Sequence, residues 1–511
     1  MDGSSIPEIE LSRSEAERRE ITMQPFDLVI RGGAVVTASD TMQADIAVRG
    51  ESIAAIGRDL GPSRREIDAR GKLVLPGGVD SHAHIEQLSA AGIMNADTFE
   101  TATTSAAFGG TTTVIPFAAQ HVGMNLTTVV DDYHRAAERG AVVDYAFHMI
   151  IADPSEKTLT KDVPLLVKAG HASLKLFMTY DRLKVDDEQL LDVLAAAREN
   201  RAFVCVHAEN HGMITWMSKR LLEGGNTAPK FHAISHPRLG EAEAFTRLIA
   251  CAELVDQPIM IFHVSTTEGA AVIRQARGRG LKVFAETCPQ YLFMTKQDLD
   301  KPGLEGAKWM FSPPAREKDD QDALWRALAL GDLQIISSDH APYAFDNTGK
   351  LAAGKHPTFK QIANGMPGLE ARMPIVFDAM VSKGRFDVNR FVEWTATNPA
   401  KIYGLHPRKG SIAIGADADI AIWDPKKKMT FSDDRVRDRT RYTPWAGRTV
   451  KGWPVTVLRR GEIIVENEKL CAAPGSGQFL PHQAGWAAQP LGRAAPEFDS
   501  CRNVARPKPK L

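Results

Sequence analysis

Five residues with metal-binding side chains stand at or near the ends of predicted strands. His82 and His84 close the first of these strands, and because side chains alternate along a strand, both point to the same side. His207 ends the fifth strand, His263 lies near the end of the sixth, and Asp339 ends the eighth. Imidazole and carboxylate groups are suitable ligands for zinc and similar divalent ions. One such histidine is more often an ordinary polar residue, but five ligand-type residues at corresponding positions favour a metal site.

Lys175 lies within the otherwise apolar strand SLKLFM, where an unpaired ammonium group would be costly. Burial favours the neutral amine and lowers its pKa. A neutral amine can add carbon dioxide to form a carbamate, whose two oxygens could bridge two metal ions about 3.5–4 Å apart. The alternative is a salt bridge between Lys175 and a carboxylate, and the spacing of the residues leaves both interpretations open.

Eight short apolar runs alternate with amphipathic helical stretches between residues 71 and 404. Near-continuous apolar strands alternating with helices indicate a parallel sheet, and eight such units indicate a (β/α)8 TIM barrel. The C-terminal ends of barrel strands converge on one face, so the five ligand-type residues are expected to meet there. The eight runs are 74–84, 111–117, 143–151, 173–180, 202–207, 258–264, 282–287 and 333–339.

The long stretch 340–370 is rich in Gly and Pro and is expected to form loops over the barrel mouth. Four further histidines do not follow the strand-end rule. We interpret these four as ordinary polar residues: His211, His232, His236 and His340.

Both ends of the chain carry β-branched runs punctuated by Gly turns, which predict strands. We expect residues 25–70 and 405–470 to form one small β-sandwich domain, into which the barrel of residues 71–404 is inserted. Residues 1–24 are interpreted as an N-terminal arm. Residues 471–511 form a C-terminal tail that either packs on a neighbouring subunit or stays mobile.

Composition excludes several classes of protein. The chain has 62 Lys+Arg against 63 Asp+Glu, so it has no general attraction for nucleic acid or anionic lipid. It contains no apolar run long enough to span a bilayer, and its polar first residues do not resemble a secretory signal. The 5 cysteines are unclustered and odd in number, which favours a reducing cytoplasm over a disulfide framework. These features predict a cytoplasmic globular protein without nucleic-acid or membrane partners.

Several motifs in order resemble the dihydropyrimidinase/D-hydantoinase branch of the amidohydrolase superfamily. They are HAH, SLKLFMTY, VCVHAEN, IFHVST and IISSDHAP, and FETATTSAAFGGTTTVI, FSPPAREKDD and NGMPGLE strengthen the match. The resemblance runs from about Asp27 to about Glu466. It implies a distorted (β/α)8 barrel with a smaller β-sandwich domain, in a homotetramer or homodimer.

The resemblance also implies a role for each matching residue. His82, His84 and Asp339 would bind the more buried of two divalent ions, with zinc as the expected metal. His207 and His263 would bind the second. The side chain bridging the two ions would be Lys175, modified to N6-carboxylysine.

The remaining implied residues contact the substrate. Tyr180 would contact the scissile carbonyl, while Ser312 and Asn364 would hold the ring amide through their main chain. A hydroxide bridging the zinc ions would attack the carbonyl, and Asp339 would pass its proton to the leaving nitrogen. The substrates would be dihydropyrimidines or 5-substituted hydantoins, and the products N-carbamoyl amino acids.

Two stretches depart from the family pattern and concern the substituent pocket. IEQLSAAGIMN follows HAH, and Lys184 stands where a hydrophobic residue is usual. Lys184 is either a solvated loop lysine or a cation facing the exocyclic group of the substrate. Other cyclic amidases, namely allantoinase, an imidase or dihydroorotase, are alternative functions. No clear arginine follows HAH to hold the carboxylate of dihydroorotate. A non-catalytic scaffold is a further alternative, disfavoured because all six ligand positions are occupied.

Overall fold

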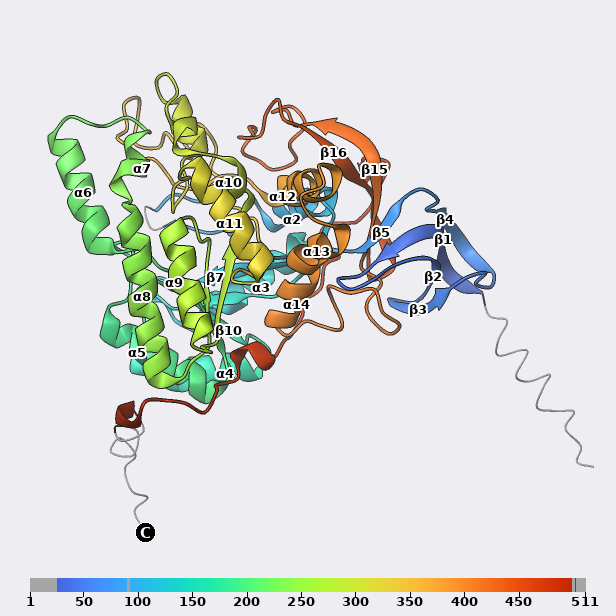
Figure 1. Cartoon of the computed structure of the whole chain (residues 1–511), viewed down its shortest axis with the longest axis horizontal. Coiled ribbons are helices and arrows are strands. Elements are labelled where there is room, and N and C mark those ends of the chain that lie inside the picture. The colour runs from blue at the N-terminus through green and yellow to red at the C-terminus, as the bar shows by residue number, and fades with distance from the viewer. Residues whose placement is uncertain (1–24, 90–91, 499–500, 502–511) are drawn as a thin grey trace, which may run out of the picture.

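The computed structural model describes residues 25–89, 92–498 and 501, so the predicted arm over residues 1–24 lies outside the described residues. The described chain forms two nine-stranded sheets, one in a small domain and one in a large domain surrounded by helices (Figure 1). No helix in the described ranges is long and apolar enough to cross a membrane.

The small domain is built from both ends of the chain, as expected. Its sheet has the order β18-β17-β16-β15-β5-β1-β2-β3, with β4 beside β1, and most of its pairings are antiparallel. Apolar side chains from both ends of the chain, such as Ile46 and Ile420, pack in one core. The strands are β1 (Phe26–Val36), β2 (Thr41–Arg49), β3 (Ser52–Gly57), β4 (Ser63–Asp68), β5 (Leu73–Pro76), β15 (Ile420–Thr430), β16 (Thr449–Arg459), β17 (Glu462–Glu466) and β18 (Lys469–Leu470).

The large domain contains a curled parallel sheet of order β14-β13-β12-β11-β10-β9-β7-β6, with β8 beside β7. Its longer strands β7, β10 and β11 are buried at every position, which explains their near-continuous apolar sequences. The strands are β6 (Gly78–Ala83), β7 (Thr111–Ala119), β8 (Asp144–Tyr145), β9 (His148–Ile150), β10 (Ser173–Phe177), β11 (Phe203–His207), β12 (Ile259–Ile261), β13 (Val283–Thr287) and β14 (Ile335–Ile336).

Helices connect the barrel strands and cover the outside of the sheet (Figure 1). They begin at capping residues such as Asp186 and Asn210, whose side chains accept backbone N–H groups. The α-helices are α2 (Phe99–Phe108), α3 (Leu126–Gly140), α4 (Val163–Lys168), α5 (Asp187–Asn200), α6 (His211–Glu223), α7 (Phe231–Ser235), α8 (Arg238–Val255), α9 (Thr267–Gly278), α10 (Pro289–Phe293), α11 (Lys318–Leu330), α12 (Leu369–Phe377), α13 (Val388–Val392) and α14 (Asn398–Ile402). Short 3-10 or π segments are η1 (Thr158–Asp162), η2 (Lys296–Leu299), η3 (Glu305–Trp309), η4 (Asp378–Ser382), η5 (Glu393–Thr397) and η6 (Trp486–Ala488).

The two edge strands of the curled sheet meet, which makes it a distorted (β/α)8 barrel. Ala83 and His340 form a parallel bridge, and the His84 N–H donates to the His340 carbonyl at 2.6 Å. The buried Arg372 donates to the carbonyls of Val79 in β6 and Ile336 in β14, both at 3.1 Å. The fold class predicted from the sequence is therefore confirmed.

The predicted strand over residues 74–84 is two strands in two different sheets. β5 belongs to the small domain and β6 to the barrel, and Gly77 joins them. A Cβ atom at Gly77 would lie 2.1 Å from the Thr112 Oγ1 atom, so any side chain here would collide with β7. The chain thus crosses between the domains immediately before His82 and His84.

The described part of the C-terminal tail packs on the chain's own barrel. It runs across the ends where barrel strands begin: the Leu480 N–H donates to the Tyr145 carbonyl and the His482 N–H to the Gly170 carbonyl. Leu480 and the small residues of η6 join the core cluster inside the barrel. The tail adopts this position because its apolar residues close the N-terminal end of the barrel.

Two histidines buried where the tail meets the barrel, His171 and His482, should make the protein sensitive to acid. Burial lowers the pKa of His171 to about 3 and that of His482 to about 4. An unfolded histidine titrates near a pKa of about 6.5, so the unfolded chain binds more protons at acid pH. Their contribution to stability is complete above pH 7 and is lost as the pH falls, by about 2 kcal/mol for each histidine at pH 5.

Urea unfolding midpoints measured between pH 7.5 and pH 5 test this expectation. His482→Gln should flatten the pH dependence, whereas replacing the exposed His356 with glutamine should leave it unchanged. Equal slopes in all three proteins would contradict the assignment.

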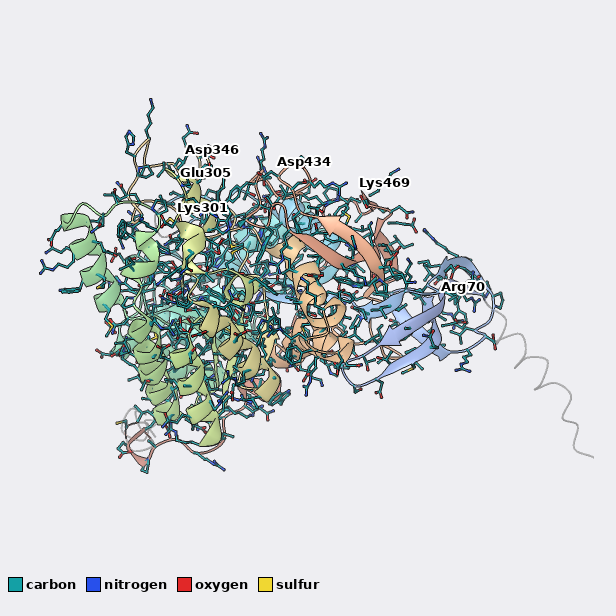
Figure 2. The ribbon with its side chains drawn as sticks, turned by 45° about the horizontal axis from the view of Figure 1, so that its top comes forward. Arg70, Lys301, Glu305, Asp346, Asp434 and Lys469 are labelled. Carbon is teal, nitrogen blue, oxygen red and sulfur yellow. The ribbon has the colours of Figure 1, made fainter. Side chains whose placement is uncertain are left out.

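The surface carries charges of both signs without a dominant excess. The exposed charged side chains include Arg70, Lys301, Glu305, Asp434 and Lys469, which are labelled in Figure 2. This mixture agrees with the formal net charge of -1.

Candidate active site

A cavity of about 350 Å³ opens at the C-terminal ends of the barrel strands. The loop segments over residues 341–365 form part of its wall, as expected for the stretch above the barrel mouth. Every residue that the sequence proposed for the site lines this cavity: His82, His84, Lys175, Tyr180, His207, His263, Ser312, Asp339 and Asn364.

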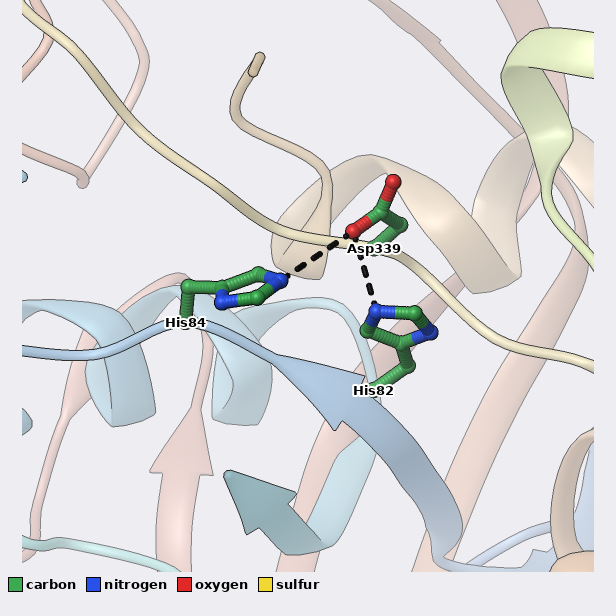
Figure 3. A group of neighbouring side chains, drawn as sticks. All are labelled: His82, His84 and Asp339. Carbon is green, nitrogen blue, oxygen red and sulfur yellow. Dashed lines mark ion pairs between the residues drawn. The ribbon is translucent and has the colours of Figure 1, made fainter. Parts of the chain in front are cut away.

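His82, His84 and Asp339 converge on one point of the cavity (Figure 3). The Asp339 Oδ1 atom lies 3.1 Å from His82 Nε2 and 3.5 Å from His84 Nε2. One ligand atom from each residue falls within 4.8 Å of the others, which is compatible with shared coordination of one cation. β6 supplies His82, and His84 follows directly after it.

His207 and His263 form a second pair beside the first group. Their ring centroids are 4.4 Å apart, and the ring of His263 lies 5.4 Å from that of His82. β11 ends at His207, and His263 follows β12, so the parallel register brings the two rings together. The two groups therefore share one cavity floor.

Lys175 lies at the same floor without a hydrogen-bonding partner among the described residues. Its Nζ atom sits 4.1 Å from the ring centre of Phe262 and 4.6 Å from that of Phe177. Burial lowers its pKa to about 7, so a substantial part of the amine is neutral near physiological pH. The alternative of a structural salt bridge is wrong for the described residues, because no carboxylate pairs with this lysine there.

Each of three histidines at the floor uses one ring nitrogen for a supporting contact. His82 Nδ1 lies 2.5 Å from Glu286 Oε1, and His84 Nδ1 lies 2.7 Å from Gln87 Oε1. His207 Nε2 lies 2.9 Å from Glu209 Oε2. Such contacts fix the ring orientation and the tautomer of a ligand histidine, which leaves the other nitrogen for a metal.

The electrostatics of the floor favour a bound cation. Burial alone would lower the pKa of His82, but the charges of Asp339 and Glu286 outweigh burial and raise it. Burial likewise opposes ionisation of Asp339, yet His82 and His84 hold the pKa of this carboxyl well below its usual range. Burial lowers the pKa of His263 well below its usual range, so this imidazole is neutral, as metal binding requires.

Family and structural comparisons decide the classification. The model of the amidohydrolase family matches residues 73–464. The D-hydantoinase of Ralstonia pickettii is 41% identical over 456 residues, covering 89% of this chain and 98% of that protein. The D-hydantoinase of Streptomyces coelicolor is 42% identical, covering 89% of this chain and 97% of that protein. The dihydropyrimidinase structure from Brevibacillus agri has a TM-score of 0.87 at 41% identity, covering 89% of this chain and 99% of that one.

The chain belongs to the amidohydrolase family. The floor residues fit the divalent metal centre that this family generally holds. The buried nitrogen of Lys175 lacks a partner among the described residues, and the His82, His84 and Asp339 atoms are close enough to share an ion. The family match and the relatives together make the protein a hydrolase of carbon–nitrogen bonds in cyclic amides.

The wall of this amidohydrolase site carries the three residues expected to contact substrate. The Tyr180 hydroxyl interacts with the Ser312 side chain, and the Tyr180 ring lies 5.1 Å from that of His207. The Asn364 Oδ1 atom is buried and lacks a hydrogen-bonding partner among the described residues. Burial raises the pKa of Tyr180 well above its usual range, so its hydroxyl stays protonated and can donate.

Three site residues have left-handed backbone conformations. The φ angles are 75° at Tyr180, 41° at His263 and 48° at Asp339. Such angles are uncommon for residues with side chains, and they concentrate where surrounding structure imposes a functional geometry.

Three of the four histidines interpreted as ordinary polar residues lie at the cavity. His211, His232 and His236 line the cavity, and His236 Nδ1 lies 2.8 Å from Glu209 Oε1. His211 begins α6, His232 lies in α7 and His236 follows α7 directly. The search for ligands at strand ends does not consider helices, so it could not find them. His340 lies outside the cavity lining, and its Nε2 atom contacts Asp97 Oδ2 at 2.9 Å.

Lys184 is a solvated loop lysine. It is exposed and absent from the cavity lining, whereas its neighbours Arg182 and Leu183 line the cavity. The N–H groups of Leu183 and Lys184 both donate to the Tyr180 carbonyl, at 3.0 and 2.9 Å. The turn places Lys184 outside the cavity lining, which favours the solvated alternative over the inward-facing one.

Proposed function

We propose that this amidohydrolase opens dihydropyrimidines or 5-substituted hydantoins to N-carbamoyl amino acids, using two divalent ions, preferably zinc. The observation that carries the proposal is the convergence of five histidine and aspartate ligands around the partnerless Lys175 nitrogen in one cavity. The named relatives, D-hydantoinases and a dihydropyrimidinase, support this substrate class.

The proposed metal centre uses six residues at the floor of the cavity, namely His82, His84, Lys175, His207, His263 and Asp339. His82, His84 and Asp339 would hold one ion, and His207 and His263 would hold the other. The Lys175 amine attacks carbon dioxide, an N–C bond forms and a proton leaves, which gives a carbamate with two oxygens for the ions. When bound, divalent ions polarise a carbonyl and lower the pKa of a coordinated water to about 7.

The residues of the chain then position the substrate and move the proton. The main chain at Ser312 and Asn364 holds the ring amide, and the Tyr180 hydroxyl donates to the carbonyl oxygen as negative charge develops there. Asp339 accepts the proton of the attacking water and passes it to the ring nitrogen as the carbon–nitrogen bond breaks.

Tyr180→Phe tests the donor at the carbonyl oxygen. Loss of one such donor lowers kcat by about 10²–10³-fold in well-studied hydrolases, and a similar loss is expected here with a small change in KM. Steady-state kinetics on hydantoin measures both constants, and metal content should match that of the parent. A kcat within twofold of the parent would exclude Tyr180 from this role.

The function itself is tested with the purified, metal-loaded protein. Turnover is compared on dihydrouracil, hydantoin, 5-substituted hydantoins, allantoin and dihydroorotate. Ring opening of the first three classes is expected to dominate. Preference for allantoin or dihydroorotate would replace the proposal by another cyclic amidase, and no turnover with a full metal complement would indicate a scaffold.

We also propose a cytoplasmic homotetramer. All five cysteines are free, which suits a reducing compartment. Light scattering during size-exclusion chromatography measures the assembly, and a monomeric mass would contradict it.

A further inference from the structure

Two cations without ion-pair partners among the described residues line the outer part of the cavity. They are Arg182 and Lys360, and both side chains are exposed, whereas the metal ligands at the floor are buried or nearly so. No carboxylate elsewhere in the described ranges forms a salt bridge with either cation. Their charges therefore remain available to a molecule that enters the cavity.

The acidic groups of the cavity do not balance these charges. Only Asp181 and Asp339 contribute carboxylates to the described lining. Asp181 Oδ1 lies 3.2 Å from His211 Nε2, and Asp339 lies at the floor between His82 and His84. The mouth of the cavity thus carries a local excess of positive charge, although the whole chain is nearly neutral.

Both cations stand on the segments that present the substrate-contacting residues. Arg182 follows Tyr180 in the turn whose N–H groups donate to the Tyr180 carbonyl. Lys360 precedes Asn364 and follows the buried Phe359, whose N–H donates to the Thr227 carbonyl at 2.8 Å. Both anchored segments line the cavity, so the two cations stand on walls of the space that the proposed substrate would enter.

We propose that the preferred substrate carries a carboxylate on its exocyclic substituent, and that Arg182 and Lys360 bind this group. The inference rests on the proposed cyclic-amide function and names its substrate class. An arginine can hold a carboxylate through two parallel N–H donors, and a lysine adds a point charge. An aryl or alkyl substituent would leave both cations without a partner.

The experiment compares two substrates of nearly equal shape, 5-(2-carboxyethyl)hydantoin and its carboxamide. The ratio of their kcat/KM values measures the effect of the substituent's charge, because a general loss of activity lowers both values equally and cancels. The metal-loaded parent should favour the carboxylate by about tenfold. Arg182→Gln and Lys360→Gln should each lower the ratio by about threefold, and the double variant should bring it close to one.

Lys184→Gln is the matched control, because this lysine lies on the same turn but outside the cavity lining. If Arg182 and Lys360 bind the substrate carboxylate directly, the ratio of the two kcat/KM values in Lys184→Gln should equal that of the parent. If the ratio falls equally in all three single variants, the carboxylate responds only to the overall positive potential around the cavity entrance. That result would overturn the assignment of Arg182 and Lys360.

The parent protein separates failure of this inference from failure of the proposed function. If it opens both hydantoins with a ratio near one, the cations do not select the substituent although the function stands. If it opens neither these hydantoins nor dihydrouracil, the proposed function itself fails.

Discussion

Replacing His82 with alanine is expected to abolish turnover and remove metal from the protein. The His82 side chain is buried, lies 3.1 Å from Asp339 and is held from behind by Glu286. Removing it leaves His84 and Asp339 as an incomplete ligand set, and the attacking water loses its activation. We expect kcat to fall on the order of 10³-fold or more, with less than half of the parent's metal content.

A second variant distinguishes the loss of a metal ligand from the loss of the residue that orients this ligand. Glu286→Gln leaves a side chain of the same size beside His82 but weakens its contact with the His82 ring. We expect kcat to decrease by about 10–100-fold. Elemental analysis and hydantoin turnover are measured on the same preparations. A His82→Ala protein with full metal content and parental kcat would remove this residue from the site.

The second large effect is expected at Lys175. Lys175→Arg should lose metal and activity, because a guanidinium stays protonated and cannot form a carbamate. Lys175→Ala should also be inactive, but a short carboxylic acid such as propionate can enter the vacated space and supply two oxygens. Partial return of both metal and turnover with added propionate is the expected result.

Lys350 provides a matched control for the rescue experiment. It is also fully buried, and burial lowers its pKa to about 7. Its Nζ atom, however, donates to the carbonyls of Met310 and Ala363, at 3.2 and 2.9 Å. Lys350→Ala should keep its metal and gain nothing from propionate. Normal metal and turnover in Lys175→Arg would refute the carbamate.

The barrel was predictable because its strands carry a strong signal. β7, β10 and β11 are buried throughout, and burial on both faces demands unbroken apolar sequence. The division of residues 74–84 at Gly77 was not predictable, because β5 and β6 are both largely buried, only one residue separates them, and only their three-dimensional neighbours assign them to different sheets.

The candidate metal ligands could be found because strand ends are visible in a sequence. Their supporting residues could not, since Glu286 lies inside β13 and meets His82 only across the folded barrel. Glu209 offered one signal, its position two residues after His207, but its second partner His236 is distant in the sequence. Arg182 and Lys184 are both exposed cations in the turn after Tyr180, and only the folded structure shows that Arg182 lines the cavity whereas Lys184 does not.

The position of the C-terminal tail has a practical consequence for immobilising this enzyme. The tail crosses the barrel face where strands begin, and its Ala495 N–H donates to the Leu254 carbonyl on that side. The substrate cavity opens where the strands end. A solid support coupled through a cysteine introduced near Ala495 would therefore hold the enzyme with its substrate cavity facing the solution. Truncation before Phe479 to shorten such a tether would instead uncover the bottom of the barrel and shorten the working life of the catalyst.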